Sequence, residues 1–125
     1  MLVLANKAEE ELVDIYKDID EEFSKNAFEA ALKAWGYLEE HKKSAGFKNP
    51  KELVTGEYPD SDDTDERYWA AAQMYRATGD DKYSQALLSM KTSKGLDWST
   101  VGDYGNIAII TMNNADKESA IYKNA

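Results

Sequence analysis

The chain lacks several residue types that common functional sites require. Its 125 residues include no cysteine, one histidine and only two prolines. Without cysteine, neither a disulfide framework nor thiolate chemistry is available. A histidine-based triad and a multi-histidine zinc site are excluded within this chain, because His41 is its one histidine and no serine or cysteine nucleophile pattern lies near it. We therefore expect His41 to be an exposed residue at a helix end.

Long apolar runs and an excess of basic residues are also missing. No apolar run approaches the roughly 20 residues of a membrane span, and the first residues lack the basic and apolar regions of a signal peptide. The net charge of −9 argues against a nucleic-acid partner, which needs clustered Lys and Arg. It suits a neutral or cationic ligand, and solubility alone would explain it equally well. With 42% hydrophobic residues, the chain fits one folded domain.

The apolar residues follow a helical period. The pattern predicts helices over about 4–16, 20–41, 63–78, 82–91 and 101–112, and a short one from about 116. Residues 106–110 could form a strand by composition, but their neighbours favour a helix. The expected class is therefore all-α, with consecutive helices paired as α-hairpins in a solenoid or a slice of an α/α toroid. No fixed-period repeat is present, which weakens the solenoid interpretation.

Residues at the ends of these helices carry start and stop signals. Asp63 is predicted to cap the free N–H groups of the third helix, with Glu66 as its capping-box partner. Gly79 suits the left-handed position that ends the helix, and Asp80 or Asp81 suits the cap of the next one.

An acidic segment precedes the third helix, at the end of an irregular stretch over about 44–63. Six carboxylates lie within ten residues: Glu57, Asp60, Asp62, Asp63, Asp65 and Glu66. A hard cation would relieve their repulsion, because Ca²⁺ takes six to eight oxygen ligands. A solvated acidic helix start, favoured by the helix dipole, explains the segment as well. The EF-hand spacing is absent, and neighbours in one loop rarely face each other across a sugar ring as glycosidase carboxylates must.

Trp98 lies in a glycine-containing loop, outside any helical stripe. A flat indole suits the apolar face of a sugar, so an exposed Trp98 would mark a binding surface. The alternative is that Trp98 fills a gap beneath its own loop. Trp35 and Trp69 fall on helical faces and are predicted to belong to the core.

Several segments together resemble a known family. They read Ala-Ala-Leu-Lys-Ala-Trp-Gly-Tyr-Leu at 30–38, Gly-Phe-Lys-Asn-Pro at 46–50, Thr-Gly-Glu-Tyr-Pro-Asp at 55–60, Asp-Glu-Arg-Tyr-Trp-Ala-Ala-Ala at 65–72 and Ala-Thr-Gly-Asp at 77–80. This run resembles the catalytic domain of glycoside hydrolase family 9, the cellulases and endoglucanases. The subgroup with an N-terminal immunoglobulin-like domain is the most similar.

The resemblance implies an (α/α)6 toroid that hydrolyses β-1,4-glucan with inversion, in a secreted parent protein. The family's general base comes from an Asp-Ala-Gly-Asp motif and its acid from a glutamate after a His-x-Arg segment, and this sequence contains neither. We therefore expect residues 1–125 to be a single all-helical fragment that carries no catalytic residue and is inactive alone. Such a slice would expose faces that its neighbours should cover, and it should self-associate.

The resemblance also implies particular site residues. The positions matching substrate-binding residues of the family are Tyr58, Asp60 and Trp98, and those matching a structural calcium site are Ser61, Asp62, Asp65 and Glu66. In some members a later aspartate completes the calcium site, whereas here those positions hold Ser99 and Thr100, although Asp103 could substitute. Bound calcium would make the melting temperature fall on chelation.

A second hypothesis from a different class is a free-standing helical-hairpin interaction module without catalysis. The flanking reading frame distinguishes the two. Flanking sequence that contains the catalytic motifs would support the enzyme hypothesis. Stop codons at both ends of the 125 residues would support the interaction module.

Overall fold

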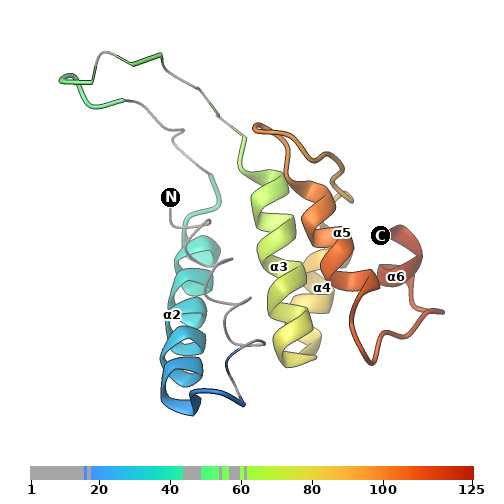
Figure 1. The fold of residues 1–125 in the computed structure, drawn as a ribbon. Helices are drawn as coiled ribbons and strands as arrows, with labels where there is room; N and C mark the ends of the chain where they lie inside the picture. Colours follow the sequence, from blue (N-terminus) through green and yellow to red (C-terminus); the bar gives the residue numbers. More distant parts are fainter. Residues whose placement is uncertain (1–15, 17, 44–48, 54, 57–59, 61) are drawn as a thin grey trace.

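The computed structural model describes residues 16, 18–43, 49–53, 55–56, 60 and 62–125, and this part of the chain contains helices and no strands (Figure 1). The helices are α2 (Glu21–Glu40), α3 (Thr64–Thr78), α4 (Asp81–Ser89), α5 (Gly102–Ile110) and α6 (Ala120–Asn124). The all-α prediction is thus confirmed, and the strand alternative for 106–110 is wrong. The helix predicted over 4–16 falls almost entirely outside the described residues. Within those described, no helix combines the length and apolar character needed to cross a membrane.

α3 is the central helix, and it packs against α5 and α4. Hydrogen bonds fix the direction of α5 relative to α3. The Asp65 carboxylate accepts from the Val101 N–H at 2.6 Å, and Arg76 donates to the Ala108 carbonyl at 3.3 Å and to the Thr111 hydroxyl at 2.7 Å. The first bond joins the N-terminal ends of the two helices and the Arg76 bonds join their C-terminal ends, so α3 and α5 run parallel, side by side.

Small side chains allow this close packing. Ala70, Ala71 and Ala72 are consecutive in α3, and all three are completely buried. Three successive buried positions point in different directions around a helix, so neighbours cover α3 on most of its circumference. The largest fully buried side chains, Met74 and Ile109, lie on α3 and α5.

Side-chain contacts connect α2 to α4 and to α3. Trp35 packs edge-on against Tyr83, with ring centroids 5.2 Å apart. Arg67 donates to the Leu38 carbonyl at 2.8 Å and to the His41 carbonyl at 2.6 Å. Leu38 lies in the last turn of α2 and His41 directly follows the helix. The carbonyls at this end have no intrahelical donors, so Arg67 both satisfies and neutralises it.

Local signals predicted most helix ends correctly. Gly79 adopts φ 65° after α3, and the Asp80 carboxylate accepts from the Lys82 N–H, as expected of a cap. The predicted capping box of Asp63 and Glu66 is wrong, because the Asp63 side chain makes no capping hydrogen bond. It pairs instead with Arg67 at 2.9 Å.

The last helix begins later than predicted, at Ala120 instead of about 116. The Asp116 carboxylate accepts from the Glu118 N–H at 2.9 Å and thereby forms a turn. Ser119 then caps α6, since its hydroxyl accepts from the Tyr122 N–H. Asp116, where the helix was predicted to begin, therefore belongs to the turn that precedes α6.

α5 approaches α3 closely at Gly105, and this contact leads to a stability prediction. A Cβ atom there would lie 2.9 Å from two ring carbons of Tyr68 and 3.1 Å from the Trp69 Cα. Tyr68 is only 3% exposed and its hydroxyl donates to Asn106 at 2.7 Å, so its ring is held in place. We expect Gly105→Ala to destabilise the chain by about 1–3 kcal/mol, measured by chemical denaturation.

Gly36 in α2 provides the matched control, because nothing lies within 4 Å of a Cβ atom built there. Gly36→Ala should stabilise the chain by up to about 1 kcal/mol through helix propensity alone. Equal effects of the two substitutions would contradict the close packing of α3 and α5.

Candidate functional site

Trp98 lies on the loop that connects α4 to α5, and its side chain is 72% exposed. The alternative that it fills a gap beneath its loop is therefore wrong. The loop turns around Asp97, whose carboxylate accepts from the N–H groups of Ser99 at 2.8 Å and Thr100 at 2.9 Å. These hydrogen bonds, with those from the two hydroxyls, hold the pKa of the Asp97 carboxyl below its ordinary value. An ordered turn thus presents the indole to solvent.

A partly buried polar network connects this loop to α3 and α5. The Asp103 carboxylate accepts from the Gly95 N–H at 3.0 Å. The Asn106 amide donates to the Ser93 carbonyl at 3.0 Å and to Asp103 at 2.8 Å. The bonds from Asn106 and Gly95 hold the pKa of the Asp103 carboxyl below its ordinary value, whereas burial raises the pKa of the Tyr68 phenol. Asp103 therefore acts as an ionised acceptor in this network.

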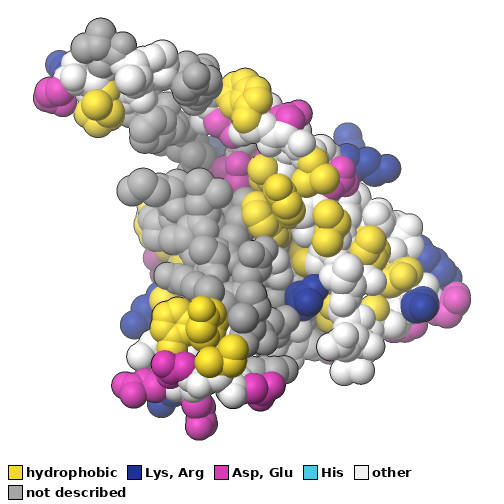
Figure 2. Space-filling view, viewed as in Figure 1, with side chains coloured by type: hydrophobic (Ala, Val, Ile, Leu, Met, Phe, Trp, Pro, Cys, Tyr) yellow, Lys and Arg dark blue, Asp and Glu magenta, His cyan; other side chains and the backbone are white. Residues whose placement is uncertain are grey.

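A second aromatic group lies where α3 and α5 meet. The rings of Trp69 and Tyr104 stack with centroids 4.5 Å apart and an interplanar angle of 22°. Tyr104 is 45% exposed, and Trp69 is partly buried. Trp35, at 5% exposed, confirms its predicted place in the core, but Trp69 does so only in part. In Figure 2, hydrophobic side chains form a row over the loop before α5 and along α5 itself.

Sequence reasoning missed Tyr104. No local pattern marks it, because its exposure depends on how α5 packs against α3. We name Trp69, Trp98 and Tyr104 the aromatic surface.

The other predicted substrate contacts are described only in part. Tyr58 lies outside the described residues. Asp60 is half-buried, and its carboxylate accepts from the Asp62 N–H at 3.2 Å. Asp62 in turn accepts from the N–H and the hydroxyl of Thr64. These bonds form the turn that leads into α3, and a substrate role for Tyr58 and Asp60 remains a prediction.

The predicted calcium ligands Asp62, Asp65 and Glu66 lie at the start of α3, whereas Ser61 lies outside the described residues. Throughout the described ranges, no three Asp, Glu, His or Cys side chains are placed to hold a metal ion together. One oxygen of Asp65 is used by the Val101 N–H at 2.6 Å. The described donors therefore do not fit a calcium ion by themselves, and the site remains a prediction that depends on Ser61.

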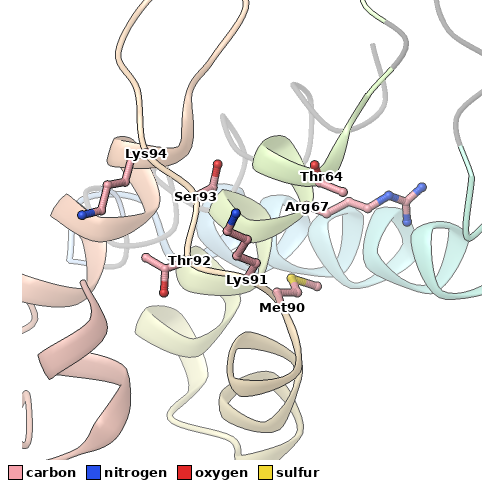
Figure 3. A pocket seen from close by; sticks show the side chains of 7 residues that line it. All are labelled: Thr64, Arg67, Met90, Lys91, Thr92, Ser93 and Lys94. Atoms are coloured by element: carbon pink, nitrogen blue, oxygen red, sulfur yellow. The ribbon is translucent and has the colours of Figure 1, made fainter.

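A cavity of about 650 Å³ lies between the start of α3 and the segment after α4 (Figure 3). Its lining residues are Thr64, Arg67, Met90, Lys91, Thr92, Ser93 and Lys94. The cations do not converge on one point, because the side chains of Arg67 and Lys94 point in opposite directions. Arg67 is also engaged by the end of α2. His41, at that same end, is exposed as predicted.

Known proteins share this fold and sequence pattern. Endoglucanase D of Acetivibrio thermocellus is 27% identical over 113 residues, which cover 86% of this chain and 18% of the relative. The cellodextrinase of Butyrivibrio fibrisolvens is 25% identical, with 89% of this chain and 24% of the relative covered. A solved structure of a thermostable endoglucanase from Alicyclobacillus acidocaldarius is 28% identical, with a TM-score of 0.77 over 89% of this chain and 21% of that one.

The chain thus spans about a fifth of the length of these relatives. Its fold is that of part of an (α/α)6 barrel, as the structural similarity shows. The model of glycosyl hydrolase family 9 matches residues 12–124, which is nearly the whole chain. The chain therefore belongs to glycosyl hydrolase family 9.

Proposed function

We propose that this chain forms part of the wall of a β-1,4-glucan cleft in an enzyme that hydrolyses the glycosidic bond with inversion. The observation that carries the proposal is the exposed indole of Trp98 on an ordered turn. The names of the relatives support the substrate class, since they include endoglucanases and a cellodextrinase. One similar structure, 28% identical with a TM-score of 0.78, is a complex with a cellobiose-like isofagomine.

The aromatic surface suits a neutral sugar. The faces of Trp98 and Tyr104 offer flat apolar area to the C–H groups of a glucose ring. The work of these residues is to bind and orient the glucan, which lowers the entropic part of the barrier. Inversion also needs a general acid and a general base, about 6.5–9.5 Å apart with a water between them. The sequence contains neither family motif for those roles, so we expect other parts of the enzyme to supply them.

Two further features of the whole protein remain predictions. One is membership of the subgroup with an N-terminal immunoglobulin-like domain, and the other is secretion. The flanking reading frame tests both, because it would contain the immunoglobulin-like domain and a signal peptide. It also tests the hydrolase itself, through the Asp-Ala-Gly-Asp motif upstream and the catalytic glutamate downstream.

We predict that the chain alone does not hydrolyse β-glucan, because it carries no acid and base pair. The measurement is the release of reducing sugar from carboxymethylcellulose by the purified chain, with a whole family 9 endoglucanase as the positive control. Hydrolysis above the buffer blank would contradict the proposed division of labour.

Replacing Trp98 should weaken sugar binding. We expect Trp98→Ala to raise the Kd for cellohexaose about 10-fold, which corresponds to roughly 1.4 kcal/mol, and Trp98→Phe to raise it less because a ring remains. Titration calorimetry measures both. Leu88→Ala is the matched control, since Leu88 is 53% exposed on α4, outside the aromatic surface. If the Leu88 and Trp98 variants bind equally well, Trp98 is not a sugar contact.

We also expect the chain to self-associate. Ile107 and Ile110 lie on one face of α5 and are 43% and 45% exposed, which suits burial against neighbouring hairpins of a complete barrel. Light scattering should show a dimer or larger species, and the double substitution Ile107→Gln and Ile110→Gln should shift it toward monomer. Leu88→Gln should not. If the unsubstituted 125-residue chain is monomeric at all concentrations, that result would count against the fragment interpretation.

A further inference from the structure

We propose that Asp65 and Asp103 are positioning residues that hold the Trp98 loop by direct hydrogen bonds, without a bridging metal ion. The inference rests on the proposed function, since it explains how the sugar-binding indole is held. The Asp65 carboxylate accepts a hydrogen bond from the Val101 N–H at one end of the loop, and the Asp103 carboxylate accepts one from the Gly95 N–H at the other end. We call these two hydrogen bonds the clamp. Trp98 lies midway, three residues from each.

The bond to Val101 is the stronger part of this clamp. Asp65 is 7% exposed, and its carboxylate oxygen lies 2.6 Å from the Val101 nitrogen. Short hydrogen bonds to a charged acceptor are roughly twice as strong as neutral ones, and limited water access strengthens them further. Asp65 lies in the first turn of α3, so the bond fixes the loop to the central helix.

The bond to Gly95 closes the other end. The Asp103 carboxylate accepts from the Gly95 N–H at 3.0 Å, and the Asp103 N–H donates to the Gly95 carbonyl at 3.1 Å. Asn106, which is 5% exposed, holds the second Asp103 oxygen and receives the Tyr68 hydroxyl. Both ends of the loop are thus connected to α3, one directly and one through Asn106.

This arrangement differs from the calcium site that the resemblance implies. There Asp65 and a residue after the loop tryptophan would share an ion. Here Asp65 reaches the loop backbone directly, and the N–H groups of Ser99 and Thr100 go to Asp97.

Amide hydrogen exchange by NMR on the 125-residue chain tests the clamp. We expect Asp65→Ala to speed exchange of the Val101 N–H about 10- to 100-fold, because a charge-assisted hydrogen bond is lost. Asp65→Asn keeps an acceptor oxygen and should restore most of the protection. Asp62→Ala is the control, because the carboxylate of this nearby acid accepts only from Thr64 among the described contacts, and it should leave the Val101 exchange rate unchanged. The wild-type chain should keep the protection in EDTA.

Two results would overturn the clamp. One is Asp65→Asn losing as much protection as Asp65→Ala. The other is EDTA removing the protection from the wild-type chain, because an ion would then hold the loop. Where circular dichroism shows Asp65→Ala to be unfolded, Asp103→Ala read at the Gly95 N–H replaces it, with the same fold-change expected. Unchanged protection at Gly95 in a folded Asp103→Ala variant would also overturn the proposal.

A binding measurement separates positioning from general stability. Asp65→Ala should weaken cellohexaose binding, whereas Leu38→Ala, which destabilises the chain by emptying a core position on α2 and leaves both carboxylates intact, should not. Equal binding losses in the two variants would overturn the positioning role. Trp98→Ala should weaken sugar binding about 10-fold, as predicted above, and keep the Val101 protection. A wild-type chain that binds no cellohexaose but protects Val101 would reject the proposed function and still support the clamp.

Discussion

The close parallel packing of α5 on α3 is the constraint on which the rest of this structure depends. Gly105 allows it, since a Cβ atom there would meet Tyr68 and the Trp69 backbone. The consecutive alanines of α3 allow its neighbours to approach. With the starts of the two helices level, Asp65 reaches Val101 and Trp69 stacks on Tyr104. Packing that buries the core thereby also sets the loop and the rings at its surface.

The sequence predicted features that depend on residues near one another in the chain. Gly79 and Asp80 act through their own backbone and that of the next turn, so the junction of α3 and α4 was predictable. Asp63 was not, because its partner Arg67 is also drawn to the end of α2, 26 to 29 residues away. Tyr104 could not be found either, since only the contact of α5 with α3 places it beside Trp69.

The candidate site shows the same division. The loop position of Trp98 could be predicted, because it falls outside any helical stripe. Its exposure could not, because the sequence equally allowed the indole to fill a gap beneath its own loop. The role of Asp65 could not be predicted. A carboxylate at an acidic helix start can interact with the helix dipole, bind a cation or accept from a distant N–H group. The structure gives it the N–H group of Val101, 36 residues further along the chain. Charge patterns in sequence thus indicate that acids gather, and tertiary contacts decide what they bind.

The central claim is that a loop clamped to α3 and α5 presents Trp98 to a β-1,4-glucan. The most direct measurement is a titration of the isotope-labelled chain with cellohexaose, followed through its backbone amide and indole N–H resonances. We expect the largest shifts at the Trp98 indole, in the amides between Gly95 and Val101, and at Tyr104. Shifts confined to α2 or α4, or none at millimolar sugar, would contradict the account.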